Sequence, residues 1–317
     1  MVCHETGQPL PKLDFYIKGG RMQWAELTAK EFPEAVKKSQ GVCIVPMGGI
    51  LEKHGDHLPL GMDMFVVDEV AKLAAKKEPA IVFPSYYFGQ IYEAMQVTGT
   101  VAIKKELMLK LLENVCEEVA RNGLKKIILL NFHGGNYNMA PFFAQCTLAE
   151  KKDYIVYISW CLGDYTKILK RKVNELFYGH GGQGETAHML AVNPKLVKMK
   201  DAWKKGAWPL KRLKYNRFQL YTGIWWYSDY PEHYAGHGLL GTRELGKKML
   251  KLDVENLVKV IKDVKKDNEA LELAKTLTIS FSLFEGYKKP IHLFGLSGPS
   301  ATFLVNYLAN VFDIKDV

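Results

Sequence analysis

Apolar residues follow two different periods along the chain, and the two periods alternate. Short continuous apolar runs, rich in β-branched residues, are typical of buried strands. Such runs occur at 41–48, 79–85, 126–130 and 154–160. Apolar positions spaced three and four apart predict helices between and after them, the clearest of which ends before Gly123. The helices are expected at 64–77, 105–122 and 138–150, from near Glu185, and over roughly 243–267.

This alternation of strands and helices predicts an α/β fold. Strands that are apolar throughout are covered on both faces, as in parallel sheets. We therefore expect a single domain with three layers, αβα, around a mostly parallel sheet. Ligands of such sheets bind beyond the carboxyl ends of the strands. The segments that follow 41–48 and 126–130 are thus the first places to search for chemistry.

The segment "ILEKHGDHLPLGMD" (50–63) directly follows the first strand. Glu52 and His54 are two positions apart, and in extended backbone such side chains point the same way. Asp63 comes at the start of the next helix, where the helix dipole favours a carboxylate. These side chains could face one ion, although a solvated loop could also be this rich in ionisable groups.

Two later segments, both rich in glycine, add candidates. His133 lies in "NFHGGN" after the strand 126–130, and it reaches the same edge if the two strands are near one another. Glu185 lies in "GHGGQGETAHML", where a glycine-rich loop leads into a helix. Taken alone, a His after a strand is more often a capping or core residue, and such a Glu is more often only a favourable charge at a helix start.

The five candidates together supply two imidazoles and three carboxylates, without a thiolate. This set suits Zn²⁺, Mn²⁺ or Fe²⁺. Five ligands exceed what one tetrahedral zinc needs, and they fit two ions about 3.5–4 Å apart that share a bridging carboxylate. The candidates are Glu52, His54, Asp63, His133 and Glu185.

Charge and cysteine content exclude some classes of protein. The formal charge is +9, but many lysines alternate with Val, Leu and Ile. This pattern is typical of the solvent-exposed face of an amphipathic helix, so we expect no nucleic-acid site. The five cysteines include no CxxC pair, which favours the reducing cytoplasm. No signal-peptide pattern is visible, and the most apolar late stretch, 291–312, is broken by Gly, Pro, Ser and Asn. We therefore expect a cytoplasmic protein without a membrane span.

Three segments, in order, resemble the signatures of the creatininase (creatinine amidohydrolase) family. They are "VPMGGILEKHGDHLPLGMD", "NFHGGN" and "GHGGQGET", and "TGT" at 98–100 resembles a further segment of the family. The resemblance covers roughly residues 20 to 250. It implies one α/β domain with a dinuclear metal centre, often assembled as a hexamer. On this basis we expect the domain to cover 1–270 and an extension, 271–317, to pack on it or on a neighbouring subunit.

The resemblance also implies a role for each candidate. The five residues named above would be ligands of two divalent cations, with Asp63 as the bridge. His180 would handle a proton beside the substrate. His57 and Asn136 would hold the ligands in place from behind, a role that metal sites usually require.

The implied reaction is hydrolysis of a non-peptide C–N bond in a cyclic or related small amide. A metal-activated hydroxide would attack the amide carbon, and His180 would give a proton to the leaving nitrogen. Two alternatives stay open. One is a deformylase for the formamide of a nucleotide or pyrimidine precursor, whose phosphate would suit the basic charge of the chain. The other is a non-catalytic α/β protein that keeps the metal site for structure or for a partner.

Some positions depart from the family pattern. Lys53 and Asp56 replace the usual Gln and Pro of the first signature, and Ala94 and Thr98 stand where His and Pro are usual. None of these positions is a candidate ligand, so the departures concern the pocket and hence the substrate.

One aromatic cluster is too dense for a plain surface loop. It could wall a pocket from a neighbouring subunit, line an oligomer interface, or pack as a satellite of the core. Its members are Trp225, Trp226, Tyr227 and Tyr230.

Overall fold

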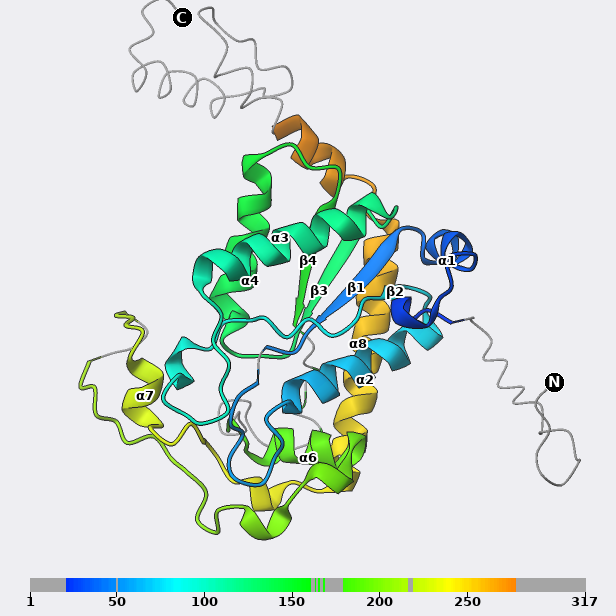
Figure 1. Cartoon of the computed structure of the whole chain (residues 1–317). Coiled ribbons are helices and arrows are strands. Elements are labelled where there is room, and N and C mark those ends of the chain that lie inside the picture. The colour runs from blue at the N-terminus through cyan, green and yellow to red at the C-terminus, as the bar shows by residue number, and fades with distance from the viewer. Residues whose placement is uncertain are drawn as a thin grey trace, which may run out of the picture.

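Four parallel strands form the centre of the molecule in the order β2-β1-β3-β4 (Figure 1). The computed structural model describes residues 21–49, 51–160, 163, 165, 168, 179–215 and 219–277. The strands are β1 (Val42–Met47), β2 (Ile81–Val82), β3 (Lys126–Asn131) and β4 (Ile155–Trp160). Parallel neighbours need crossover connections, and helices provide them here.

Helices cover both faces of the sheet. They are α1 (Phe32–Ser39), α2 (Met62–Lys77), α3 (Lys105–Arg121), α4 (Asn136–Cys146), α6 (Gln183–Val192), α7 (Trp225–Asp229) and α8 (Arg243–Lys266). Helices α2 and α8 pack on one face, and α3 and α4 on the other (Figure 1). Helix α6 packs against α2 and α8 beyond the carboxyl ends of the strands. The expected three-layer α/β fold is thus confirmed.

Six 3-10 turns lie among the described residues, and residues 270–277 are also helical. The turns are η1 (Trp24–Glu26), η2 (Tyr92–Ala94), η3 (Thr147–Ala149), η5 (Pro194–Leu196), η6 (Met199–Asp201) and η7 (Gly238–Leu240). Most of the chain between α6 and α8 has no other regular structure, apart from α7.

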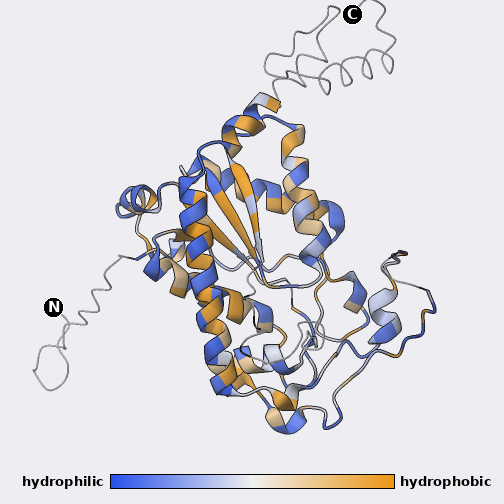
Figure 2. Cartoon of the chain, turned by 180° about the vertical axis from the view of Figure 1, so that it is seen from behind, coloured by the Kyte–Doolittle hydropathy of each residue, from blue (hydrophilic) through white to orange (hydrophobic). Residues whose placement is uncertain are grey.

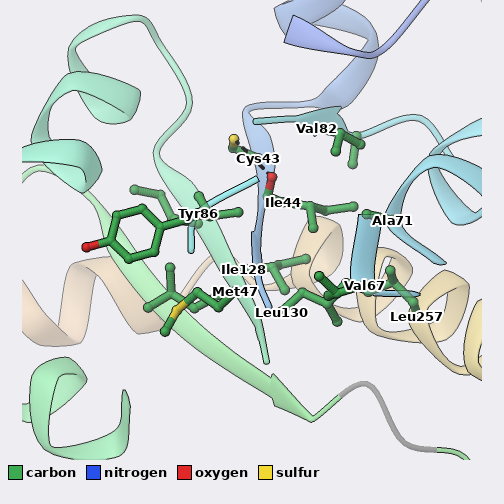
Figure 3. Packing of buried hydrophobic residues seen from close by; sticks show 14 of the residues in the cluster. Cys43, Ile44, Met47, Val67, Ala71, Val82, Tyr86, Ile128, Leu130 and Leu257 are labelled. Atoms are coloured by element: carbon green, nitrogen blue, oxygen red, sulfur yellow. Dashed lines mark hydrogen bonds between the residues drawn. The ribbon is translucent and has the colours of Figure 1, made fainter. Parts of the chain in front are cut away.

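The main core lies between the sheet and its helices. The strands are hydrophobic, whereas the helices alternate between hydrophobic and hydrophilic positions (Figure 2). Ile44 of β1 and Ile128 of β3 are register partners, and both point towards Val67 of α2 and Leu257 of α8 (Figure 3). Met47 lies on the opposite side of the sheet with Tyr86 (Figure 3). This packing fixes where β1 and β3 end, and hence where the segments after them begin.

Three boundaries differ from those expected. The strand expected at 79–85 is only Ile81–Val82, because Pro84 has no N–H for a ladder and the strand lies at an edge. The helix expected at 138–150 begins at Asn136 and gives way to η3 after Cys146. The helix expected from 64 begins at Met62, which places Asp63 in its first turn.

Several expectations concern membrane spans, cysteines and the C-terminal extension, and some of these residues lie outside the described part of the chain. No helix among the described residues is long and apolar enough to cross a membrane. The late apolar stretch 291–312, Cys3 and Cys161 lie outside those residues, as does most of the expected extension 271–317. Cys43, Cys116 and Cys146 are free thiols.

Candidate metal centre and cavity

The segments that follow β1 and β3 meet, because the two strands are neighbours and Met47 pairs with Asn131 at their ends. Gly49 passes directly beneath the ring of His133. Its φ is +71°, and a Cβ at this position would lie 2.3 Å from that ring. Only glycine fits such a conformation and such a close approach. Two parts of the chain more than eighty residues apart are therefore held in contact.

Asp63 lies at the centre of the cluster that forms there. Its Oδ1 is 3.2 Å from Nε2 of His54, and its Oδ2 is 3.2 Å from Nδ1 of His133. One carboxylate thus faces two imidazoles, each with a different oxygen. This is the arrangement that a bridging ligand needs.

Two groups of possible metal ligands share Asp63. In the first group, Nδ1 of His133 lies 2.7 Å from Oε1 of Glu52. In the second group, Nε2 of His54 lies 3.9 Å from Oε2 of Glu185. The structure therefore brings together all five candidate ligands, from β1–α2, from the segment after β3 and from α6.

Both histidines are oriented by backbone carbonyls. Nε2 of His133 donates to the carbonyl of Gln90 (2.7 Å), and Nδ1 of His54 donates to the carbonyl of Glu52 (3.2 Å). A carbonyl oxygen can only accept, so these nitrogens carry hydrogen. The other nitrogen of each ring faces the carboxylates and can bind a metal, which is the usual arrangement of metal-bound histidines.

Several buried atoms of the cluster make no hydrogen bond within the described part of the chain. They are Oε1 of Glu52, Nε2 of His54 and Oδ1 of Asp63, and their close neighbours are the charged groups of the cluster itself, at 2.7 Å for Glu52–His133 and 3.2 Å for His54–Asp63. Buried polar atoms are otherwise almost always paired. A set of two imidazoles and three carboxylates, whose ligand atoms lie within 4.8 Å of one another in each group, fits one or two divalent cations.

When no cation is bound, protons on the histidines supply the positive charge that balances the carboxylates. Burial alone would lower the pKa of His54, but the neighbouring Asp63 and other carboxylates outweigh burial and raise that pKa to about 10. Burial would also lower the pKa of His133, but Glu52 and Asp63 raise it well above its usual range. Burial opposes the ionisation of Glu52, yet the charge of His133 and the hydrogen bonds from His133 and His233 hold its pKa well below the ordinary value.

Glu185 differs from the other acids. Its side chain is 25% exposed, and it accepts a hydrogen bond from the backbone N–H of Gly181 (2.5 Å). Burial raises the pKa of Glu185 to about 7, because the nearby His54 only partly compensates for lost hydration. This carboxylate can therefore be protonated near neutral pH.

His180 forms a third possible ligand group with Glu52 and His54, but its hydrogen bond argues against a ligand role. Its ring centroid is 4.2 Å from those of both His54 and His233. Its Nε2 donates to the carbonyl of Lys53 (2.5 Å), so that nitrogen is not free to bind a metal, although it lies 3.5 Å from Glu52. Burial, together with the charge of His54, keeps the pKa of His180 well below its usual value. His180 is thus a neutral imidazole at pH 7.

His57 and Asn136 lie behind the ligands. Nε2 of His57 donates to Oγ1 of Thr186, the residue after Glu185, at 2.8 Å. Burial lowers the pKa of His57 to about 4, which keeps it neutral. Asn136 accepts from the N–H of Gln90 (3.0 Å), whose carbonyl orients His133. Each contact ties a ligand-bearing segment to a neighbouring one.

His233 is a member of the site that the sequence analysis missed. Its Nε2 donates to Oε2 of Glu52 (2.7 Å), and its Nδ1 accepts from Nε1 of Trp226 (2.8 Å). Because indole N–H is only a donor, the tautomer of His233 is fixed and Nε2 carries the hydrogen. His233 lies in an irregular segment with a left-handed backbone (φ 50°). A non-glycine residue rarely adopts this conformation, and nothing in the local sequence announces it.

A cavity of about 430 Å³ opens onto the cluster. Glu52, Asp63 and Glu185 lie at its polar end, with His133 and His180. Its other walls are largely aromatic, with Phe132, Tyr137, Tyr165, Trp225 and Trp226. Trp225 and Trp226 of the aromatic cluster therefore line a cavity of their own chain. Tyr230 packs on Trp226, with ring centroids 4.7 Å apart.

The chain matches known proteins over most of its length. The family model for creatininase, described as creatinine amidohydrolase, matches residues 25–261. A creatinine amidohydrolase of Pseudomonas putida is 28% identical over 190 residues, which are 54% of this chain and 72% of that protein. A 3-dehydro-scyllo-inosose hydrolase of Thermotoga maritima is 26% identical over 259 residues, 75% of this chain and 82% of that one.

Solved structures show the same fold. A structure described as "Creatininase Mn" has a TM-score of 0.67 at 22% identity and covers 78% of this chain and 100% of its own. A "Zn-Zn type" creatininase mutant has a TM-score of 0.62 at 22% identity, with the same coverage. A putative creatinine amidohydrolase from Bacteroides fragilis has a TM-score of 0.58 at 20% identity, over 72% of this chain and 91% of its own.

Proposed function

This chain belongs to the creatininase family, and from that premise we propose that it is a metal-dependent amidohydrolase that opens a C–N bond in a small cyclic amide. Two divalent cations (Zn²⁺, Mn²⁺ or Fe²⁺) would be held by Glu52, His54, Asp63, His133 and Glu185. The observation that carries the proposal is Asp63, whose two oxygens face different histidines at 3.2 Å each. The Mn and Zn-Zn descriptions of solved relatives support the choice of metals.

When bound, two such cations supply a hydroxide at neutral pH and polarise a carbonyl oxygen. Proton transfer falls to His180. Because its Nε2–H is donated to the carbonyl of Lys53, only Nδ1 can take up a proton. The low pKa of His180, which burial causes, keeps Nδ1 unprotonated at pH 7. His180 can therefore accept a proton from the attacking water and then give it to the leaving nitrogen.

Other residues orient the site. His233 holds one oxygen of Glu52, which leaves Oε1 directed at Asp63 and His133. His57 and Asn136 fasten the ligand-bearing segments to one another. The aromatic walls of the cavity exclude water from the substrate, and a ring of creatinine size fits within about 430 Å³.

A second candidate reaction is hydrolysis of a polyhydroxylated ring ketone. The inosose hydrolase matches 75% of this chain, whereas the creatinine amidohydrolase matches 54%. An inosose is a carbon ring without an amide, so the two relatives cannot break the same kind of bond. The same metal centre would serve both, since each reaction begins with attack on a carbonyl carbon.

Assembly and location stay proposals. We expect a homo-oligomer, a hexamer by resemblance, in the cytoplasm. Large exposed apolar side chains between α6 and α8 support association, for example Trp208 (63% exposed) and Tyr221 (70% exposed). Light scattering on the purified protein measures the oligomeric state.

Turnover by the metal-loaded protein tests the reaction. The panel contains creatinine, 3-dehydro-scyllo-inosose and N-formyl compounds. We expect hydrolysis of a ring compound, its loss with a chelator and its return with Mn²⁺ or Zn²⁺. Asp63→Asn should abolish it, whereas Asp68→Asn, five residues further along α2, should not. Turnover that survives both chelation and Asp63→Asn would refute the proposal.

A further inference from the structure

The ionisable side chains of the cavity differ in kind from those that dominate the chain. The chain carries a formal +9, yet four carboxylates line the cavity, and no Lys or Arg lines it among the described residues. Lys53, although it is next to two ligand candidates, lines a separate cavity together with Asp56 and Glu232. The basic charge of the surface therefore does not extend to the place where a substrate would lie.

One of the four carboxylates, Glu93, does not belong to the metal cluster. Its Oε2 accepts from Nε2 of Gln90 (2.9 Å). Gln90 also accepts from His133 through its carbonyl, and donates to the carbonyl of Gly135 (3.3 Å). Gln90 thus holds Glu93 in a fixed relation to His133. Oε1 of Glu93 has no hydrogen-bond donor among the described residues, although the side chain lines the cavity.

Two tryptophans line the same cavity as this carboxylate. Turn η2, which carries Glu93, packs against helix α7, which carries Trp225 and Trp226. The N–H of Trp226 is donated to His233, so Trp226 offers only its ring to the cavity. A carboxylate beside aromatic rings is a receptor for N–H or O–H donors and for cations on a flat ring. An anionic group would meet an uncompensated negative charge.

We propose that Glu93 and the Trp225–Trp226 wall form a subsite for the hydrogen-bond-donating edge of an uncharged or cationic ring. This inference rests on the proposed function, because it places the opposite edge of the ring at the metal centre. It excludes rings that carry a phosphate or carboxylate at this edge. Of the open alternatives, a phosphorylated formamide is thereby the least compatible.

Binding of matched rings to the metal-loaded protein tests the subsite. Creatinine and dihydrouracil are the uncharged probes, and dihydroorotate is the dihydrouracil ring with an added carboxylate. Calorimetry should show that wild type binds dihydrouracil at least about tenfold more tightly than dihydroorotate. Glu93→Gln should weaken binding of the uncharged rings by about tenfold or more. It should also reduce the ratio of the affinity for dihydrouracil to the affinity for dihydroorotate. Glu232→Gln, which removes an equal charge outside the cavity, should change neither.

The outcomes separate this inference from the proposed function. Three results would overturn the subsite. They are a wild-type preference for dihydroorotate, an affinity ratio of dihydrouracil to dihydroorotate that is unchanged in Glu93→Gln, and no binding of either uncharged ring. If the ratio responds to Glu93 but no ring is hydrolysed, the subsite stands and the proposed reaction fails. If rings are hydrolysed and the ratio does not respond, the reaction stands and the subsite fails. Metal content should be equal in all three proteins.

Discussion

The two halves of the candidate metal centre are built differently. The inner half comprises Glu52, His133 and Oδ2 of Asp63, and the outer half comprises His54, Glu185 and Oδ1 of Asp63. In the inner half, Glu52 and His133 are buried and each is held by a further hydrogen bond, from His233 and to Gln90. In the outer half, Glu185 is 25% exposed and its pKa is raised to about 7 by burial of its carboxylate.

This difference shows how one site can hold some ligand candidates rigidly and still leave another accessible to water and substrate. The inner half is preorganised, because its ligands are fixed before a cation arrives. The outer half borders the cavity through a ligand that water reaches, and a catalytic centre must keep such an open position. We therefore expect the inner half to bind its cation more tightly.

The largest effect is expected from the two glutamates. Glu52→Gln leaves His133 and His233 without a buried anion, and breaking such a buried pair costs about 3–5 kcal/mol of unfolding free energy. It should also remove the inner cation. Glu185→Gln should remove the outer cation at a cost of about 1 kcal/mol or less in the metal-free protein. Chemical denaturation and metal analysis measure both, and equal losses in the two variants would contradict the asymmetry.

The proton-handling residue should affect rate alone. His180→Ala should lower kcat by about 10²–10⁴-fold, because general acid–base catalysis contributes that much. Metal content should stay at the wild-type level, since Nε2 of His180 is bonded to the Lys53 carbonyl rather than free for a cation. Joint loss of metal and activity would show that His180 is a ligand instead.

Metal binding should release protons. At pH 7 the metal-free protein holds protons on His54, whose pKa nearby carboxylates raise to about 10, and on His133, whose pKa they also raise. Both must leave before a cation binds. Glu185, whose pKa burial raises to about 7, adds about half a proton. Calorimetry in buffers of different ionisation enthalpy should therefore show about two to three protons released per chain at pH 7. Release of none would contradict the assigned ligands.

The same shift makes the stability of the metal-free protein depend on pH. When the pKa of a histidine is higher in the folded state than in the unfolded state, its protonation stabilises the fold. This contribution is fully present at a pH below the unfolded-state pKa, about 6.5 for His. That contribution is lost as pH rises through the folded pKa of His54, about 10, which its carboxylate neighbours set. The Tm of the metal-free protein should therefore fall between pH 6.5 and 10, and that of the metal-loaded protein should fall less.

The smallest effect concerns the residues behind Glu52. His233→Asn should weaken the inner cation by about 10–100-fold and leave the outer one nearly unchanged, as is usual for groups that orient a metal ligand. Trp226→Phe, which removes only the N–H bonded to His233, should act in the same direction and less strongly. Trp208→Phe, at an exposed position away from the cluster, is the matched control. Equal weakening of both cations would refute the positioning role of His233.

The parts of the site that the sequence could predict are those next to strand ends. β1 and β3 are continuous apolar runs, so the residues directly after them could be placed at one edge of the sheet. Asp63 and Glu185 could be placed because each opens a helix. The convergence of the segments after β1 and β3 follows from the parallel order of the sheet, whereas the position of Glu185 depends on the packing of α6 against α2 and α8.

The remaining parts depend on long-range packing. His233, Trp225 and Trp226 lie in a long segment with little regular structure, where no periodic pattern fixes a direction. Glu93 acquires its place only because Gln90 bonds to the segment after β3. The strand at 79–85 was predicted too long because the pattern of apolar residues does not show the edge position that Pro84 tolerates.

The central claim is that two cations share Asp63, and electron paramagnetic resonance of the Mn²⁺-loaded protein tests it most directly. The account predicts two Mn²⁺ per chain with a spin-coupled signal, and loss of that signal in Asp63→Asn but not in Asp68→Asn. A single Mn²⁺ per chain, or two without coupling, would contradict it.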